Sequence, residues 1–223
     1  KKTYDKPVII VTQPEATAKE KLRSKDKRTW EYEAENVRDF AFTSSRKFIW
    51  DAMAVKLNNG TSLAMSYYPK EGNPLWEKES TKAVKNTITT YSKYSLDYPY
   101  PVAISVHTAS IGMEYPMICF NGPRPERDGT YPERTKHALI GVVIHEVGHN
   151  WFPMIVASDE RMWTWMDEGL NSFLEHYGSI DFDKDWPAMR LPGSAKSIAN
   201  FMRSNPGVPI MEHSDLQFNG FGP

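Results

Sequence analysis

The sequence lacks several features that would assign it to common classes of protein. Its single cysteine, Cys119, excludes an internal disulfide and a cysteine-rich structural zinc site. The formal net charge is -1, so no general attraction to nucleic acid is implied and no nucleic-acid partner is expected. No apolar run approaches the roughly 18 residues of a membrane span, and no transmembrane segment is predicted.

Several catalytic signatures are also missing. The chain contains no G-x-S-x-G, no P-loop and no G-x-G-x-x-G, so a serine nucleophile and a nucleotide site have no support. The polar residues 1–5 do not form a secretory signal, and the compartment stays open between the cytoplasm and a bacterial envelope. Apolar residues make up 40% of the chain, which is enough to support a core.

The most informative stretch is H-E-x-x-H at residues 145–149, which follows an apolar run that is typical of a buried helix. On a helix, His145 and His149 lie one turn apart on the same face, so both imidazoles can bind one zinc ion. Glu146 lies beside that ion, where it can act as a general base. Taken alone, the motif also fits ordinary core or surface histidines. His107, at the end of a strand, is interpreted as structural.

A third ligand is available in Glu168, which follows His149 after eighteen intervening residues. A carboxylate in the first turn of a second helix completes a His₂Glu set and leaves the fourth position to water, as in a catalytic zinc site. We therefore expect one Zn²⁺ per chain. The residues that indicate this second helix, with its apolar side toward the first, are Glu168, Leu170, Phe173, Leu174 and Tyr177.

This two-part motif resembles that of the gluzincin metallopeptidases of the aminopeptidase N type. That family has H-E-x-x-H-x-W-F, which Trp151 and Phe152 continue to match, followed by W-L-N-E-G, which residues 165–169 match closely. Asp167 stands where the family usually has Asn. The resemblance covers roughly residues 30–223. It implies an α+β fold, with a thermolysin-like zincin catalytic domain preceded by the end of a β-sandwich-like domain.

The resemblance also implies roles for the ligand set. Zinc held by His145, His149 and Glu168 would polarise the scissile carbonyl and acidify its water. Glu146 would take the proton of that water and pass it to the leaving amine. The predicted activity is that of a zinc-dependent metallopeptidase.

A second family motif, G-x-M-E-N, has a partial match upstream of the zinc helix. Met113 and Glu114 match, whereas Ile111 replaces Gly and Tyr115 replaces Asn. In the family this Glu binds the free α-amino group of the substrate. Glu114, with Met113 and Gly112, is therefore the expected substrate-binding segment for a peptide with a free N-terminus, and the activity is expected to be that of an aminopeptidase. The alternative for Glu114 is an ordinary edge-strand carboxylate.

Two other functions stay open at this point. Some relatives in this family hydrolyse an epoxide at the same zinc, and nothing in the sequence separates that reaction from peptide cleavage. Other relatives have lost the zinc and serve as protein-binding scaffolds. The intact ligand set with Glu146 in place argues against a scaffold.

The chain is expected to divide into two parts, a C-terminal part of an N-terminal β domain at residues 1–68 and a thermolysin-like catalytic domain at residues 69–223. Residues 58–60, Asn-Asn-Gly, predict a hairpin turn. Residues 111–120 predict an edge strand along the active-site cleft. The other predicted elements are strands at 7–11, 29–34, 37–42, 48–55, 62–68 and 102–106, and helices at 75–95 and 189–202.

The resemblance further suggests that the chain is a fragment with flanking domains missing. The family stabilises the oxyanion with a Tyr some way after the third ligand, but no Tyr follows Tyr177 in this sequence. We therefore expect the oxyanion-stabilising Tyr beyond Pro223. The catalytic domain would then be truncated at its C-terminus, and this chain alone would be weakly active or inactive.

Overall fold

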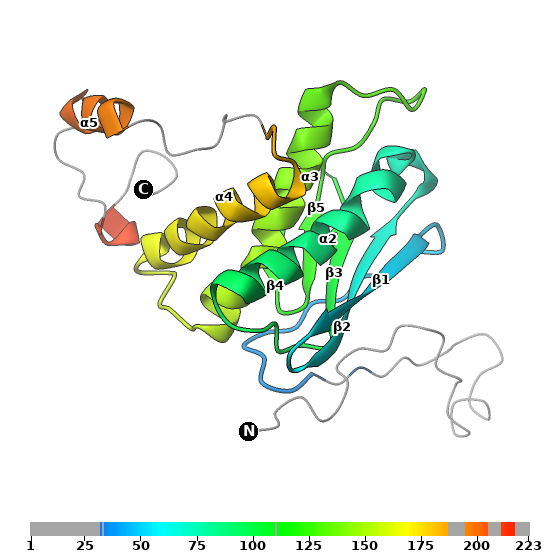
Figure 1. The fold of residues 1–223 in the computed structure, drawn as a ribbon, viewed down its shortest axis with the longest axis horizontal. Coiled ribbons are helices and arrows are strands. Elements are labelled where there is room, and N and C mark those ends of the chain that lie inside the picture. The colour runs from blue at the N-terminus through cyan, green and yellow to red at the C-terminus, as the bar shows by residue number, and fades with distance from the viewer. Residues whose placement is uncertain (1–31, 33, 110, 187–194, 205–210, 217–223) are drawn as a thin grey trace.

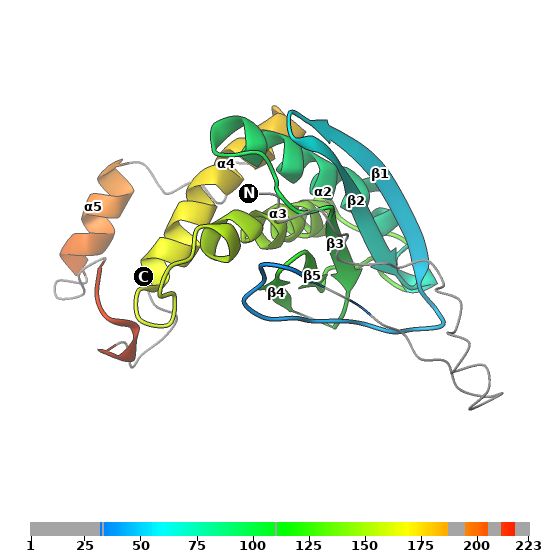
Figure 2. The same ribbon diagram turned by 90° about the horizontal axis from the view of Figure 1, so that it is seen from below.

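The computed structural model describes residues 32, 34–109, 111–186, 195–204 and 211–216. It has a mixed α+β architecture, in which the helices α2, α3 and α4 lie on one side of a five-stranded sheet of order β1-β2-β3-β5-β4 (Figures 1 and 2). The predicted strand at 7–11 and most of the one at 29–34 lie outside the described residues. Among the described residues, no helix has both the length and the apolar character needed to span a bilayer.

The first two strands form the predicted hairpin. β1 (Ile49–Leu57) pairs antiparallel with β2 (Gly60–Tyr68), and the pair closes where Leu57 faces Gly60, a residue with a φ of 144° that favours glycine. β2 then pairs in parallel with β3 (Val102–His107). The sheet therefore continues across residue 68, while the division of the chain into two domains at that residue stays a prediction.

β3 is buried along nearly its whole length, as its apolar sequence predicts, and it pairs in parallel with β5 (Ile118–Asn121). The prediction of one strand at 111–120 is wrong. The chain turns at Met117, which has a φ of 66°, and this turn separates the edge strand β4 (Gly112–Tyr115) from β5. The side-chain oxygen of Asn150 accepts the N–H of Met117 at 2.8 Å and holds the turn.

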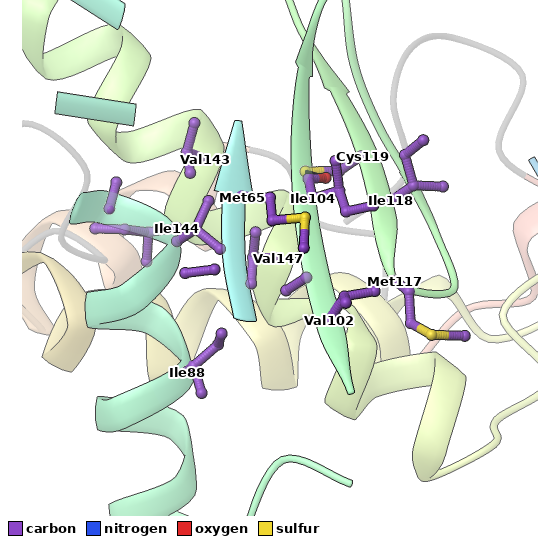
Figure 3. Close-up of a cluster of buried hydrophobic side chains, with 14 of the residues drawn as sticks. Met65, Ile88, Val102, Ile104, Met117, Ile118, Cys119, Val143, Ile144 and Val147 are labelled. Atoms are coloured by element: carbon purple, nitrogen blue, oxygen red, sulfur yellow. Dashed lines mark hydrogen bonds between the residues drawn. The ribbon is translucent and has the colours of Figure 1, made fainter. Parts of the chain in front are cut away.

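The core lies between the sheet and two helices, α2 (Leu75–Tyr94) and α3 (Glu133–Gly148). Helical spacing brings apolar residues of both to the sheet side, as predicted for 75–95. Figure 3 shows Ile88 of α2 and Ile144 of α3 among the side chains that meet the sheet residues Met65 and Ile104. This packing fixes the end of α3 that carries the zinc motif.

α4 (Leu170–Phe182) packs against α2 and α3. The prediction that its apolar side faces the zinc-motif helix is only partly met. Leu170 is 40% exposed and Phe173 is 62% exposed, whereas Leu174 is buried. The inner face of α4 is mostly polar or small because it supports the metal-site helix. The buried residues of α4 are Asn171, Leu174, Glu175, Gly178 and Ser179.

The remaining elements are short. The predicted strand at 37–42 is wrong, since this segment has no regular structure and is held by ion pairing of Arg38 with Glu160. The helix predicted at 189–202 is described from residue 195 onward, as α5. The short elements are η1 (Lys70–Gly72), α5 (Ala195–Ser204), η5 (Ser214–Leu216) and two wide π-helical turns, η2 (Asn150–Ile155) and η3 (Trp165–Gly169).

Candidate active site

Three of the predicted site residues converge where α3 ends. His145 is in the last turn of α3, His149 is the first residue after it, and Glu168 comes from the turn η3 that leads into α4. The Nε2 atoms of the two histidines are 3.1 Å apart. Glu168 Oε2 lies 3.1 Å from His145 Nε2 and 3.7 Å from His149 Nε2.

This spacing fits a divalent cation. Two ligand atoms at about 2.05 Å from a zinc ion, at the tetrahedral angle, lie about 3.3 Å apart. The three measured separations lie close to that value, and the donor set of two imidazoles and one carboxylate is one that zinc accepts with an open fourth position. The residues present therefore fit the zinc ion that the sequence predicts.

Both imidazoles are oriented through their other ring nitrogen. His145 Nδ1 lies 3.0 Å from Glu175 Oε2, and His149 Nδ1 lies 2.8 Å from the main-chain oxygen of Phe152. Donation from each Nδ1 leaves the Nε2 lone pair directed at the metal position. These contacts therefore hold both rings in an orientation that suits metal binding.

The surrounding carboxylates make this site attractive to positive charge. Burial lowers the pKa of His145, but hydrogen bonds to Glu168 and Glu175 outweigh it and raise the pKa to about 10. The hydrogen bond to His145 lowers the pKa of Glu168. The acids that favour a proton here also favour a metal cation in its place.

Glu146 lies beside the ligands, as predicted, and it is only 6% exposed. Burial raises the pKa of its carboxyl to about 7, against the opposite effect of the two histidines. Its Oε2 atom has no hydrogen-bond partner among the described residues. A buried carboxylate oxygen without a partner, next to a metal position, is suited to accept a proton from water.

The edge strand β4 brings Glu114 to the same site. Acceptor atoms of Glu114, Glu146 and His149 lie within 4.8 Å of one another. Burial is the main cause that raises the pKa of Glu114. Met113 on the same strand is 39% exposed, and Gly112 lies against Glu146, where a Cβ atom would overlap the carboxylate.

A pocket of about 500 Å³ opens beside these residues. It runs along α3 and the first turns of α4, so a bound molecule would lie against the candidate zinc ligand His145 and the edge strand. The residues that line it are Gly112, Val142, His145, Glu146, Ser172 and Glu175.

Sequence reasoning missed the residues that hold the ligands in place. Glu175 follows Glu168 by seven residues, a spacing that returns to the same helix face and could have revealed it. The buried Asn171 donates from Nδ2 to the main-chain oxygen of His145 at 2.9 Å and has no comparable signal. Asp167, noted only as a departure from a motif, lies 2.8 Å from His149 Nδ1.

Two examples stand for the many solved structures that are similar to this chain. Aminopeptidase A of Legionella pneumophila in complex with aspartic acid matches with a TM-score of 0.52 and 14% identity, over 60% of this chain and 16% of that one. A mutant M1 zinc metallopeptidase of Deinococcus radiodurans, bound to a Tyr-Ser-Ala substrate, matches with a TM-score of 0.49 and 18% identity. That match covers 74% of this chain and 34% of that one. At these identities the likeness concerns the fold.

The sequence itself matches a family model. No curated protein sequence matches the chain. However, residues 78–204, more than half of the 223, match the peptidase family M1 domain, and they include both parts of the zinc motif. The chain spans only 16% and 34% of the two solved structures it resembles. With its family match and its converging His, His and Glu ligands, the chain belongs to peptidase family M1.

Proposed function

We propose that this chain is the catalytic part of a zinc-dependent aminopeptidase, which removes N-terminal residues from peptides. The observation that carries the proposal is the convergence of His145, His149 and Glu168 at the spacing of a tetrahedral zinc site. Membership of peptidase family M1 supports the same chemistry.

The ligands and their supports would bind the metal in a fixed position. His145, His149 and Glu168 would hold one zinc ion, which when bound supplies positive charge that polarises a carbonyl and acidifies water. Glu175 and the main-chain oxygen of Phe152 orient the two rings, so little rearrangement is needed on binding.

Glu146 would act as the general base. Its free Oε2 atom accepts the proton of the attacking water, and the resulting carboxylic acid donates that proton to the amine that leaves. Burial favours the protonated form of this carboxyl, which makes the carboxylate a better acceptor of the water proton in the first step. No other buried acid is needed for either transfer.

Glu114 would select substrates that have a free N-terminus. Its carboxylate lies on the edge strand, within 4.8 Å of the acceptor atoms of Glu146 and His149. A peptide whose first residue lies at this position brings its ammonium group to Glu114 and its first peptide bond to the metal. An internal peptide bond has no such charge beside it, so this contact would favour cleavage of the first peptide bond, which is exopeptidase activity.

The metal content of the purified chain tests the proposal. We expect about one zinc per chain, and a strong loss of bound zinc in Glu168→Ala. Glu126→Ala removes an exposed carboxylate away from the site and should bind zinc like the parent. Equal zinc content in Glu168→Ala and the parent would refute the ligand set, and a chain that binds no zinc would favour a scaffold function instead.

A further inference from the structure

Asp167 lies beside the proposed metal ligand His149. It is neither one of the three proposed ligands nor the proposed base. It sits in the turn η3, directly before Glu168, and is only 6% exposed. Its Oδ1 atom lies 2.8 Å from His149 Nδ1. His149 is itself 1% exposed, so this contact is screened from water.

Two oxygen atoms compete for the single proton of that ring nitrogen. The main-chain oxygen of Phe152 is also 2.8 Å from His149 Nδ1, and it is the partner with which this ring nitrogen forms a hydrogen bond. Asp167 Oδ1 is left without a hydrogen bond among the described residues. A buried carboxylate oxygen in that position is costly unless positive charge lies nearby.

The neighbouring charges indicate where that compensation comes from. The nearby Arg38 is engaged by Glu160 in a paired ion contact. The imidazole of His149 is the group that Asp167 faces directly, and the Nε2 atom of that ring points at the metal position. Positive charge bound to His149 is therefore available to balance Asp167.

We propose that Asp167 is a positioning residue that strengthens His149 as a metal ligand. Its carboxylate lies against the Nδ1 side of the ring, and its negative charge stabilises the positive charge that the ring shares with a bound metal. The inference rests on the proposed zinc site and adds to it a specific determinant of metal affinity.

Both histidines are then supported by an acid. Glu175 supports His145 in the same way, with its Oε2 atom 3.0 Å from His145 Nδ1. With the ligand Glu168, and with Glu114 and Glu146 close by, five carboxylates lie around the metal position, so their negative charge exceeds that of a divalent ion. Such a site should bind zinc tightly and be less stable without it.

Zinc affinity of the full chain tests the role of Asp167, with a chromophoric chelator as competitor. Asp167→Asn has the same shape and loses only the charge, whereas Asp167→Ala loses the acceptor as well. Removal of such supporting groups typically weakens metal binding by 10–100-fold, and we expect about that loss in Asp167→Ala and a smaller loss in Asp167→Asn. Asp185→Asn removes an exposed charge and should bind zinc like the parent.

Two further readouts separate positioning from general stability. The metal-free Asp167→Asn chain should melt at the same temperature as the parent or higher, because a buried oxygen without a donor has lost its charge. The absorption spectrum of the Co²⁺-loaded variant should shift relative to the parent, because the His149 ring turns or becomes a weaker ligand. Should Asp167→Ala fail to fold, Asp167→Asn decides the outcome.

The outcomes also distinguish this inference from the proposed function. If the parent binds zinc and Asp167→Asn binds it equally tightly with an unchanged Co²⁺ spectrum, Asp167 has no positioning role although the zinc site stands. A weaker affinity that only follows a lower metal-free melting temperature likewise overturns the inference. A parent chain that binds no zinc overturns both proposals.

Discussion

The hydroxyl of Tyr91 donates a hydrogen bond of 2.9 Å to the side-chain oxygen of Asn171, deep between α2 and α4. Both residues are fully buried, and burial holds the pKa of Tyr91 well above its usual value, so the hydroxyl stays a donor. Asn171 then donates to the main-chain oxygen of His145 at 2.9 Å. These two hydrogen bonds connect the core helix α2 to the helix turn that carries His145, the first of the proposed zinc ligands.

Substitution of Asn171 is therefore expected to destabilise the fold strongly. Asn171→Ala removes two buried side-chain hydrogen bonds, one from the Tyr91 hydroxyl and one to the His145 main-chain oxygen, although the hydroxyl keeps the Asn171 main-chain oxygen at 3.1 Å. At about 1 kcal/mol for each hydrogen bond, we expect a loss of about 2 kcal/mol in addition to the lost packing. Tyr91→Phe removes the hydroxyl itself and should cost about 1 kcal/mol. Urea unfolding of both variants and of the double variant measures this, and strictly additive effects would contradict the coupling.

Gly148 is expected to tolerate no side chain, although it lies within a helix. A Cβ atom at this position would overlap the side-chain oxygen of Asn171 and the hydroxyl of Tyr91. Gly148→Ala should therefore destabilise the chain by about 1–3 kcal/mol, the usual range for an overpacked core. Gly169→Ala is the matched control, because nothing lies within 4 Å of the added atom. Thermal unfolding should show a lower melting temperature for Gly148→Ala and an unchanged or higher one for Gly169→Ala.

Much of the site could be predicted because its chemistry is written in short segments. The spacing of His145 and His149 requires only a helix, and Glu168 and Glu114 belong to motifs with a fixed order of residue types. The supports could not be predicted in the same way. Tyr91 and Asn171 are 80 residues apart, and only the packing of α2 against α4 brings them together.

The errors in the predicted fold have the same origin. The parallel pairing of β2 with β3 could not be predicted, because it is made across the intervening helix α2. The spacing of apolar residues predicted the wrong buried face for α4. Its inner face carries the polar residues Asn171 and Glu175, and Phe173 is exposed. The local sequence pattern reflects the propensity of each segment, whereas strand pairing and helix orientation depend on contacts between distant segments.

Asn150 is expected to stabilise the turn that separates β4 from β5. Its side-chain oxygen accepts from Met117 N at 2.8 Å, and its amide donates to the Val147 carbonyl at 2.9 Å. Asn150→Ala would leave the Met117 N–H buried without an acceptor, at about 1–3 kcal/mol. Asn150→Asp keeps the acceptor but loses the donor and buries a charge, so it should be destabilising as well. Urea unfolding checks both, and wild-type stability in Asn150→Ala would refute the role.

His107 should make the chain sensitive to mild acid. Burial, followed by the nearby charge of Arg124, lowers the pKa of this histidine, and its Nε2 atom has no hydrogen-bond partner among the described residues. Because the folded pKa lies below the unfolded value of about 6.5, protons bind the unfolded chain more strongly. The free energy of unfolding should therefore fall as pH drops below about 6.5. The fall should be shallower in His107→Gln, and parallel pH profiles for the two chains would contradict this.

The last prediction concerns the choice of substrate, which rests on Glu114. A free α-amino group carries a positive charge, and Glu114 is the carboxylate that β4 holds beside Glu146. Removal of one partner from a buried charge pair typically costs about 2–5 kcal/mol, which corresponds to about 30-fold or more in kcat/KM. Glu114→Gln keeps the shape of the side chain and removes only the charge, so its zinc content should equal that of the parent.

Turnover of an amino-acid amide and of its N-acetylated form measures this selectivity. The assay compares the parent and Glu114→Gln at equal bound zinc. The parent should hydrolyse the free amide and leave the acetylated one intact, and Glu114→Gln should lose about 10²-fold on the free amide. Glu126→Gln, an exposed acid away from the site, should match the parent. Equal rates of the parent on both substrates would mean that the enzyme does not read the N-terminus, because acetylation removes the only charge that Glu114 could bind.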